Sequence, residues 1–117
     1  MKYCSIFANY IYETVTREAM KSECTFKHGA CLVYKNKIIA QGYNKYIYNK
    51  VNDKQRRYTI HAEVDCVAKI PPKAFDSTKL ELYVVRINKQ GDLKDSKPCN
   101  NCYNFLIRRN IHKIFFS

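Results

Sequence analysis

The chain has 117 residues, with 21 lysine and arginine residues against 10 acidic ones, a formal net charge of +11. Hydrophobic residues make up 46% of it, which predicts a folded globular protein and excludes a disordered one. We expect one domain over residues 1–117, with no membrane span and a cytoplasmic location, because no apolar run approaches the roughly 20 residues of a spanning helix. The positive charge favours a phosphorylated or polyanionic partner, although solubility alone also explains it.

The first part of the chain predicts a helix, a hairpin and a long loop. An apolar stripe at mixed three- and four-residue spacing predicts a helix over residues 5–21, with Ser5 as its N-cap. Two short apolar runs, 31–34 and 38–40, flank a polar Lys-Asn-Lys turn and predict a β-hairpin. Residues 44–60 have no clear periodicity, and we expect an irregular loop there.

The 44–60 segment combines basic residues with tyrosines. Its basic side chains are Lys45, Lys50, Lys54, Arg56 and Arg57, and the tyrosines in or next to it are Tyr43, Tyr46, Tyr48 and Tyr58. Basic side chains can contact phosphates, and exposed aromatic rings can stack on bases. A solvated loop whose tyrosines pack on the domain explains the same pattern, so both interpretations stay open.

The second part of the chain alternates helices and strands. The predicted elements are a helix over 61–70, a strand over 80–87, an exposed loop over 88–97, a helix over 99–109 and a strand over 111–116. Pro71 and Pro72 end the first of these helices. A strand–helix–strand–helix–strand order implies right-handed crossovers and a sheet that is at least partly parallel.

Two motifs, His61-Ala62-Glu63 and Pro98-Cys99-Asn100-Asn101-Cys102, carry the chemistry. One histidine and two cysteines suit Zn²⁺ and leave a fourth tetrahedral position for water. Cys99 and Cys102 are one helical turn apart, so both sulfurs can reach the same ion. Glu63 can take a proton from the water and return it to a leaving amine. Both halves occur in the order that is typical of zinc deaminases, H-x-E followed by P-C-x-x-C.

A structural zinc site is the alternative interpretation of these residues. It would need a fourth protein ligand, and the available side chains are His28, His112 and Cys66, none of which lies at motif spacing. Cys66, like Cys24 and Cys31, lies in an apolar-rich segment and is expected to be a small buried hydrophobic residue.

From about Lys27 to Phe116 the sequence resembles the cytidine and deoxycytidylate deaminase family. The resemblance rests on the segments His28-Gly29-Ala30, Gly42-Tyr43-Asn44, His61-Ala62-Glu63 and Ser96 to Cys102. It implies an α/β fold with three α/β/α layers around a central mixed sheet. It also implies that His61, Cys99 and Cys102 bind zinc and that Glu63 is the catalytic proton shuttle.

The resemblance further implies three substrate contacts and an assembly state. Asn44 would hydrogen-bond the sugar, the backbone N–H of Ala62 would bind the pyrimidine carbonyl, and His28 belongs to the same substrate-binding set. Most members of the family assemble into homo-oligomers, so a homo-oligomer is expected here.

The expected function is zinc-dependent hydrolysis of a cytosine nucleoside or nucleotide, a small molecule, to its uracil form with release of ammonia. One alternative is a deaminase that acts on a base in RNA or single-stranded DNA, which the charge and the tyrosine-rich segment favour. The other is a catalytically idle zinc module that binds nucleic acid or a protein partner. The glutamate of the motif argues against the idle module, because a structural zinc site has no use for it.

Overall fold

The computed structural model describes residues 8–117, so the beginning of the expected N-terminal helix, with Ser5, lies outside the described residues. The elements are α1 (Asn9–Met20), β1 (Lys27–Tyr34), β2 (Lys37–Tyr43), β3 (Lys45–Val51), β4 (Lys54–Ile60), α2 (Ala62–Val67), the 3₁₀ helix η2 (Ser77–Lys79), β5 (Leu80–Ile87), β6 (Leu93–Lys94), α3 (Asn100–Arg108) and β7 (Lys113–Phe116). Among residues 8–117, no helix has both the length and the apolar character that crossing a bilayer requires.

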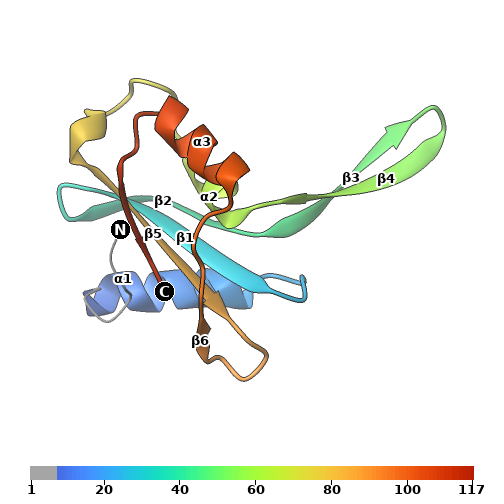
Figure 1. The fold of residues 1–117 in the computed structure, drawn as a ribbon, viewed down its shortest axis with the longest axis horizontal. Coiled ribbons are helices and arrows are strands. Elements are labelled where there is room, and N and C mark those ends of the chain that lie inside the picture. The colour runs from blue at the N-terminus through green and yellow to red at the C-terminus, as the bar shows by residue number, and fades with distance from the viewer. Residues whose placement is uncertain (1–7) are drawn as a thin grey trace.

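A central sheet lies between α1 on one face and α2 and α3 on the other (Figure 1). Strand β1 pairs antiparallel with both β2 and β5, and its Leu32 lies opposite Leu82 of β5. The other edge of β5 is shared by β7, which runs parallel to it, and by the short antiparallel strand β6. The fold is therefore the predicted three-layer α/β/α arrangement with a mixed sheet.

Successive residues of the central strands face opposite layers, as the twofold period of a β-strand requires. In β1, Cys31 and Val33 pack under α1, whereas Ala30 and Leu32 pack under the layer of α2 and α3. Both faces of β5 are buried in the same way, which explains its near-continuous apolar sequence.

Two glycines let the helices approach the sheet closely, one on each face. A Cβ atom on Gly29 of β1 would lie 2.0 Å from the carbonyl oxygen of Val15 in α1. A Cβ atom on Gly42 of β2 would lie 2.5 Å from the backbone nitrogen of Cys66 in α2. Because these atoms are backbone, a side chain at either position would force the helix away from the sheet.

The prediction of an irregular loop over residues 44–60 is wrong. Strands β3 and β4 form a separate two-stranded antiparallel hairpin that extends away from the central sheet as an arm (Figure 1). Its turn is Asn52-Asp53, with φ angles of 51° and 61°, which suit the tight turn of a β-hairpin. The arm is exposed along most of its length, so no alternation of buried and exposed residues marks it in the sequence.

Two smaller boundaries also differ from the prediction. Helix α2 ends at Val67 and not at residue 70, because the N–H groups of Lys69 and Ile70 bond to carbonyls three residues back and a proline follows. The expected loop over residues 88–97 contains the short strand β6.

Candidate metal and catalytic site

The starts of α2 and α3 converge at one end of the layer that they share. His61 is the N-cap residue of α2 and Cys99 is the N-cap residue of α3, and both have extended backbones. Cys102 lies one turn inside α3 and is buried. The two motifs, almost 40 residues apart in the sequence, are therefore brought together by local helix starts.

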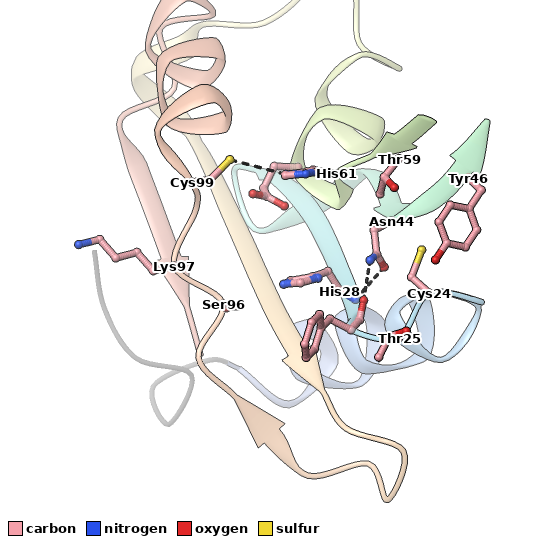
Figure 2. A pocket seen from close by; sticks show the side chains of 12 residues that line it. Cys24, Thr25, His28, Asn44, Tyr46, Thr59, His61, Ser96, Lys97 and Cys99 are labelled. Atoms are coloured by element: carbon pink, nitrogen blue, oxygen red, sulfur yellow. Dashed lines mark hydrogen bonds between the residues drawn. The ribbon is translucent and has the colours of Figure 1, made fainter. Parts of the chain in front are cut away.

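The three predicted metal ligands form one cluster. The Nδ1 atom of His61 lies 2.9 Å from the Sγ atom of Cys102 and 3.7 Å from the Sγ atom of Cys99, and all three ligand atoms lie within 4.8 Å of one another. Figure 2 shows His61 and Cys99 facing each other across this gap.

The donor set and its spacing fit a zinc ion. Tetrahedral bonds of about 2.0–2.3 Å place nitrogen and sulfur ligands roughly 3.5–3.8 Å apart, so small side-chain adjustments would complete the geometry. Burial, the main cause, and the nearby Glu63 carboxylate raise the pKa of the Cys102 thiol, so zinc binding would release a proton from it. Among residues 8–117 the cluster contains three ligating side chains, which leaves one tetrahedral position open.

Glu63 lies in the first turn of α2 and is only 4% exposed. Burial raises the pKa of its carboxyl group, while its own backbone N–H, the His61 charge and the Cys102 thiol act in the opposite direction. Because His61 and Cys102 act on the Glu63 carboxyl group, it lies next to the ligand cluster, but it is not one of the three clustered side chains.

A cavity of about 480 Å³ opens in front of the cluster, which is a typical volume for a small-molecule site. Its lining residues come from the segment before β1, the start of β1, the link between β2 and β3, the base of the arm, the start of α2 and the loop before α3. They are Cys24, Thr25, Phe26, His28, Asn44, Tyr46, Thr59, His61, Glu63, Ser96, Lys97 and Cys99. Figure 2 shows His28, Asn44 and Thr59 beside the space below His61 and Cys99.

Asn44 and His28, two of the three predicted substrate contacts, line the cavity. The Asn44 side chain joins two backbone groups of the neighbouring segment, as the dashed lines in Figure 2 show. Its Oδ1 accepts a hydrogen bond of 2.8 Å from the His28 N–H, and its Nδ2 donates one of 2.6 Å to the Phe26 carbonyl. One hydrogen of the amide and one lone pair stay available for a ligand.

His28 and Ala62, the other two predicted substrate contacts, have different relations to the cavity. Burial, together with the charges of Arg86 and His61, lowers the pKa of His28 to about 4, so its imidazole is neutral at pH 7. Ala62 is fully buried and is not a lining residue of the cavity. Its N–H belongs to the first turn of α2, where backbone donors have no partner within the helix.

The sequence interpretation gave no role in the cavity to Tyr46, Thr59, Ser96 or Lys97, although the last two lie in the segment that leads to Cys99. Tyr46 and Thr59 face each other across the base of the arm, so a correct prediction of the hairpin would have placed them together. Ser96 is buried, and its hydroxyl donates to the Val84 carbonyl at 3.0 Å, which fixes the loop that leads to Cys99. Lys97 follows it, but its side chain extends away from the other labelled residues (Figure 2).

Comparisons with known proteins agree with this geometry. The family model described as "Cytidine and deoxycytidylate deaminase zinc-binding region" matches residues 7–117. No curated protein matches the sequence.

Solved structures share the fold. The dCMP deaminase from the cyanophage S-TIM5 in apo form is 18% identical, with a TM-score of 0.63 over 95% of this chain and 85% of that chain. The structure of that enzyme in complex with dCMP and dUMP is 16% identical, with a TM-score of 0.57 over 94% and 82%. The cytidine deaminase from Mycobacterium tuberculosis is 17% identical, with a TM-score of 0.60 over 93% and 82%.

At such identities the solved structures establish only the fold, whereas the family model covers nearly the whole chain. The cluster of His61, Cys99 and Cys102 is compatible with zinc binding, which the description of the family model names. The predicted family, enzyme class and cofactor are thereby confirmed. The chain belongs to the cytidine and deoxycytidylate deaminase family of zinc-dependent enzymes.

Proposed function

We propose that this enzyme converts a cytosine nucleoside or nucleotide to its uracil form by hydrolysis, with release of ammonia. The observation that carries the proposal is the convergence of His61, Cys99 and Cys102 with the buried Glu63 at one wall of a cavity of nucleoside size. The similarity to a dCMP deaminase and a cytidine deaminase supports cytosine as the base.

His61, Cys99 and Cys102 would hold the zinc ion. When bound, zinc activates water as a nucleophile at neutral pH. The three-ligand cluster supports an open catalytic site and not a closed structural one. Of the side chains considered as a fourth ligand, Cys66 packs in the core between α2 and the sheet, and His28 and His112 are outside the cluster.

Glu63 is proposed to move the protons of the reaction. Water adds to C4 of the cytosine ring, and the Glu63 carboxylate accepts one of its protons and delivers it to ring N3. Glu63 then accepts the proton of the new C4 hydroxyl group and passes it to the exocyclic amine, the C4–N bond breaks, and ammonia leaves while the carbonyl of uracil forms. Burial in the first turn of α2 keeps the carboxyl group away from bulk water during these transfers.

Asn44, Ala62 and His28 are proposed to bind the substrate. The free N–H of the Asn44 amide, which lines the cavity, can donate to a sugar hydroxyl. The backbone N–H of Ala62 can donate to the pyrimidine carbonyl from the start of α2. His28, which also lines the cavity and is neutral at pH 7, can donate or accept a hydrogen bond to a ligand.

The experiment is a substrate panel with the zinc-loaded protein. Cytidine, deoxycytidine, CMP, dCMP and adenosine are incubated separately, and the products are separated by chromatography. We expect uracil products from at least one cytosine compound and no inosine from adenosine. The proposal fails if every monomeric cytosine compound is returned unchanged by protein that contains zinc.

Deamination of a base within RNA or single-stranded DNA is the second candidate function. One specific observation favours it: Tyr46 and Thr59 at the base of the basic arm also line the cavity. A cytosine-containing strand added to the panel separates the candidates, because turnover of the strand alone would replace the monomer proposal.

The proposal also includes a cellular location and an oligomeric state. Thiol ligands such as Cys99 and Cys102 stay reduced in the cytoplasm, which is where we place the protein. The homo-oligomer expected from the family stays a prediction, and light scattering during gel filtration would measure the number of subunits.

A further inference from the structure

The arm formed by β3 and β4 has two different faces. Cross-strand partners in an antiparallel pair lie on the same face, and alternate residues along each strand share it. The register pairs Tyr46 with Thr59, Tyr48 with Arg57 and Lys50 with Gln55, so these six residues form one face, which we call the arm face. The opposite face includes the pairs Lys45–Ile60, Ile47–Tyr58 and Asn49–Arg56.

The arm face is continuous with the cavity. Its first pair, Tyr46 and Thr59, lines the cavity, and the next pairs continue outward along the arm. Figure 2 shows Tyr46 and Thr59 at the side of the cavity from which the arm leaves. The guanidinium carbon of Arg57 lies 4.2 Å from the centre of the Tyr46 ring, and the Tyr48 side chain is 57% exposed.

The charge of the arm indicates the chemistry of its partner. Residues 45–60 contain five basic side chains and one acidic side chain, Asp53. Only Lys45, at the base, has a carboxylate partner among the described residues, since its Nζ lies 3.1 Å from Asp65 of α2. The exposed arm therefore carries unneutralised positive charge on both faces, and its arm face combines Lys50 and Arg57 with the exposed ring of Tyr48. Two such arms would repel each other, which disfavours a second copy of the chain as the occupant.

We propose that the arm face binds single-stranded nucleic acid that runs outward from the mouth of the cavity. Arg57 and Lys50 contact the phosphates, and Tyr48 and the Arg57–Tyr46 pair stack on unpaired bases. Successive positions on one face of a strand are about 6.8 Å apart, so the face offers repeated contacts along an extended chain. A single strand fits better than a duplex, because paired bases expose no face for stacking and cannot enter the cavity.

This inference rests on the proposed function only in locating one nucleotide at the cavity mouth. The strand is held by the arm whether its base is deaminated or is only bound. Monomer turnover and strand binding are measured separately, so either can fail without the other.

Fluorescence anisotropy of a labelled single-stranded DNA rich in cytosine tests the proposal. The zinc-loaded Glu63→Gln protein is used, so that the strand is not altered during the titration. The test variant is Lys50→Glu with Arg57→Glu. The matched control is Lys54→Glu with Arg56→Glu, which makes the same change in net charge on the same hairpin but on its opposite face. Circular dichroism and zinc content confirm that both proteins are folded.

We expect the arm-face variant to lose at least about 10-fold in affinity and the control to stay within about 3-fold. The salt dependence of log K should fall by about one per lost phosphate contact in the arm-face variant. Tyr48→Ala should lose about 5-fold or more through lost stacking, without a change in salt slope. A duplex of the same sequence should bind more weakly than the single strand.

Four results would overturn the proposal. These are no binding of the strand at low salt, equal losses in the arm-face variant and its control, tighter binding of the duplex, and a change of oligomeric state in the arm-face variant with unchanged strand binding. The last result would assign the arm to contacts between copies of the chain.

Discussion

Replacing Gly42 with alanine would test how the catalytic helix is positioned. Gly42 lies in β2 directly under α2, the helix that has His61 as its N-cap and carries Glu63. The new Cβ atom would lie 2.5 Å from the Cys66 nitrogen, 2.8 Å from the Cys66 Cα and 2.9 Å from the Ala62 carbonyl oxygen. All three are backbone atoms, so no side-chain rotation can relieve the contact.

The size of the displacement follows from these distances. Ordinary contact begins at 3.4 Å, so α2 must move by about 0.9 Å relative to β2. His61 and Glu63 would move with the helix, whereas Cys99 and Cys102 belong to α3. A misplacement of about 1 Å can cost about 10²-fold in rate, and overpacking costs about 1–3 kcal/mol in the free energy of unfolding. We expect zinc affinity to fall about 10- to 100-fold, as it does when the support of a ligand is removed.

The assay measures zinc affinity by competition with a chelator, together with kcat/KM for the best cytosine substrate. Gly29→Ala is the control, since its Cβ atom would meet the Val15 oxygen at 2.0 Å and push α1, on the opposite face of the sheet. It should destabilise the fold but leave zinc affinity within about 3-fold. The reasoning is refuted if Gly42→Ala keeps normal zinc affinity and activity, or if Gly29→Ala weakens zinc binding as strongly.

Three further predictions concern single side chains of the site. Glu63→Gln should keep one zinc per chain by metal analysis and lose about 10²–10⁴-fold in turnover, whereas loss of the metal would make Glu63 a ligand. Cys99→Ser should abolish the rise in Tm that zinc produces, while Cys24→Ser, in the same cavity, should keep it; an unchanged rise in Cys99→Ser would contradict the ligand assignment. Burial and nearby positive charge lower the pKa of His28 from 6.5 to about 4, so the unfolded chain binds more protons between these values and the free energy of unfolding should increase as pH rises through them. This increase in the free energy of unfolding is at most about 3 kcal/mol, and it is smaller because part of the ring meets solvent. Urea unfolding in EDTA at several pH values measures the increase, which should disappear in His28→Gln.

The cluster of candidate zinc ligands could be predicted from the sequence because each motif acts locally. His61 and Cys99 each precede a helix, and the Cys99–Cys102 spacing is set by one helical turn. The relative positions of the side chains within each motif can therefore be inferred without knowledge of the surrounding fold. The layers could be predicted for a similar reason, since the apolar run of β5 indicates a strand covered on both sides.

The arm could not be predicted in this way. Its strands are exposed beyond the base of the arm, so no buried face imposes an apolar period on residues 45–60. Its turn is Asn-Asp, not the stronger hairpin signal Asn-Gly. The roles of Tyr46 and Thr59 as lining residues depend on that pairing, and the cavity could not be outlined without it.

Zinc-dependent release of ammonia from a cytosine nucleotide tests the central claim most directly. The protein is assayed as zinc-loaded enzyme, after removal of the metal by a chelator, and after zinc is restored, with dCMP and CMP as substrates. The account predicts ammonia and the uracil nucleotide in equal amounts, lost on chelation and recovered with zinc. Equal turnover with and without the metal, or none by zinc-loaded protein, would contradict it.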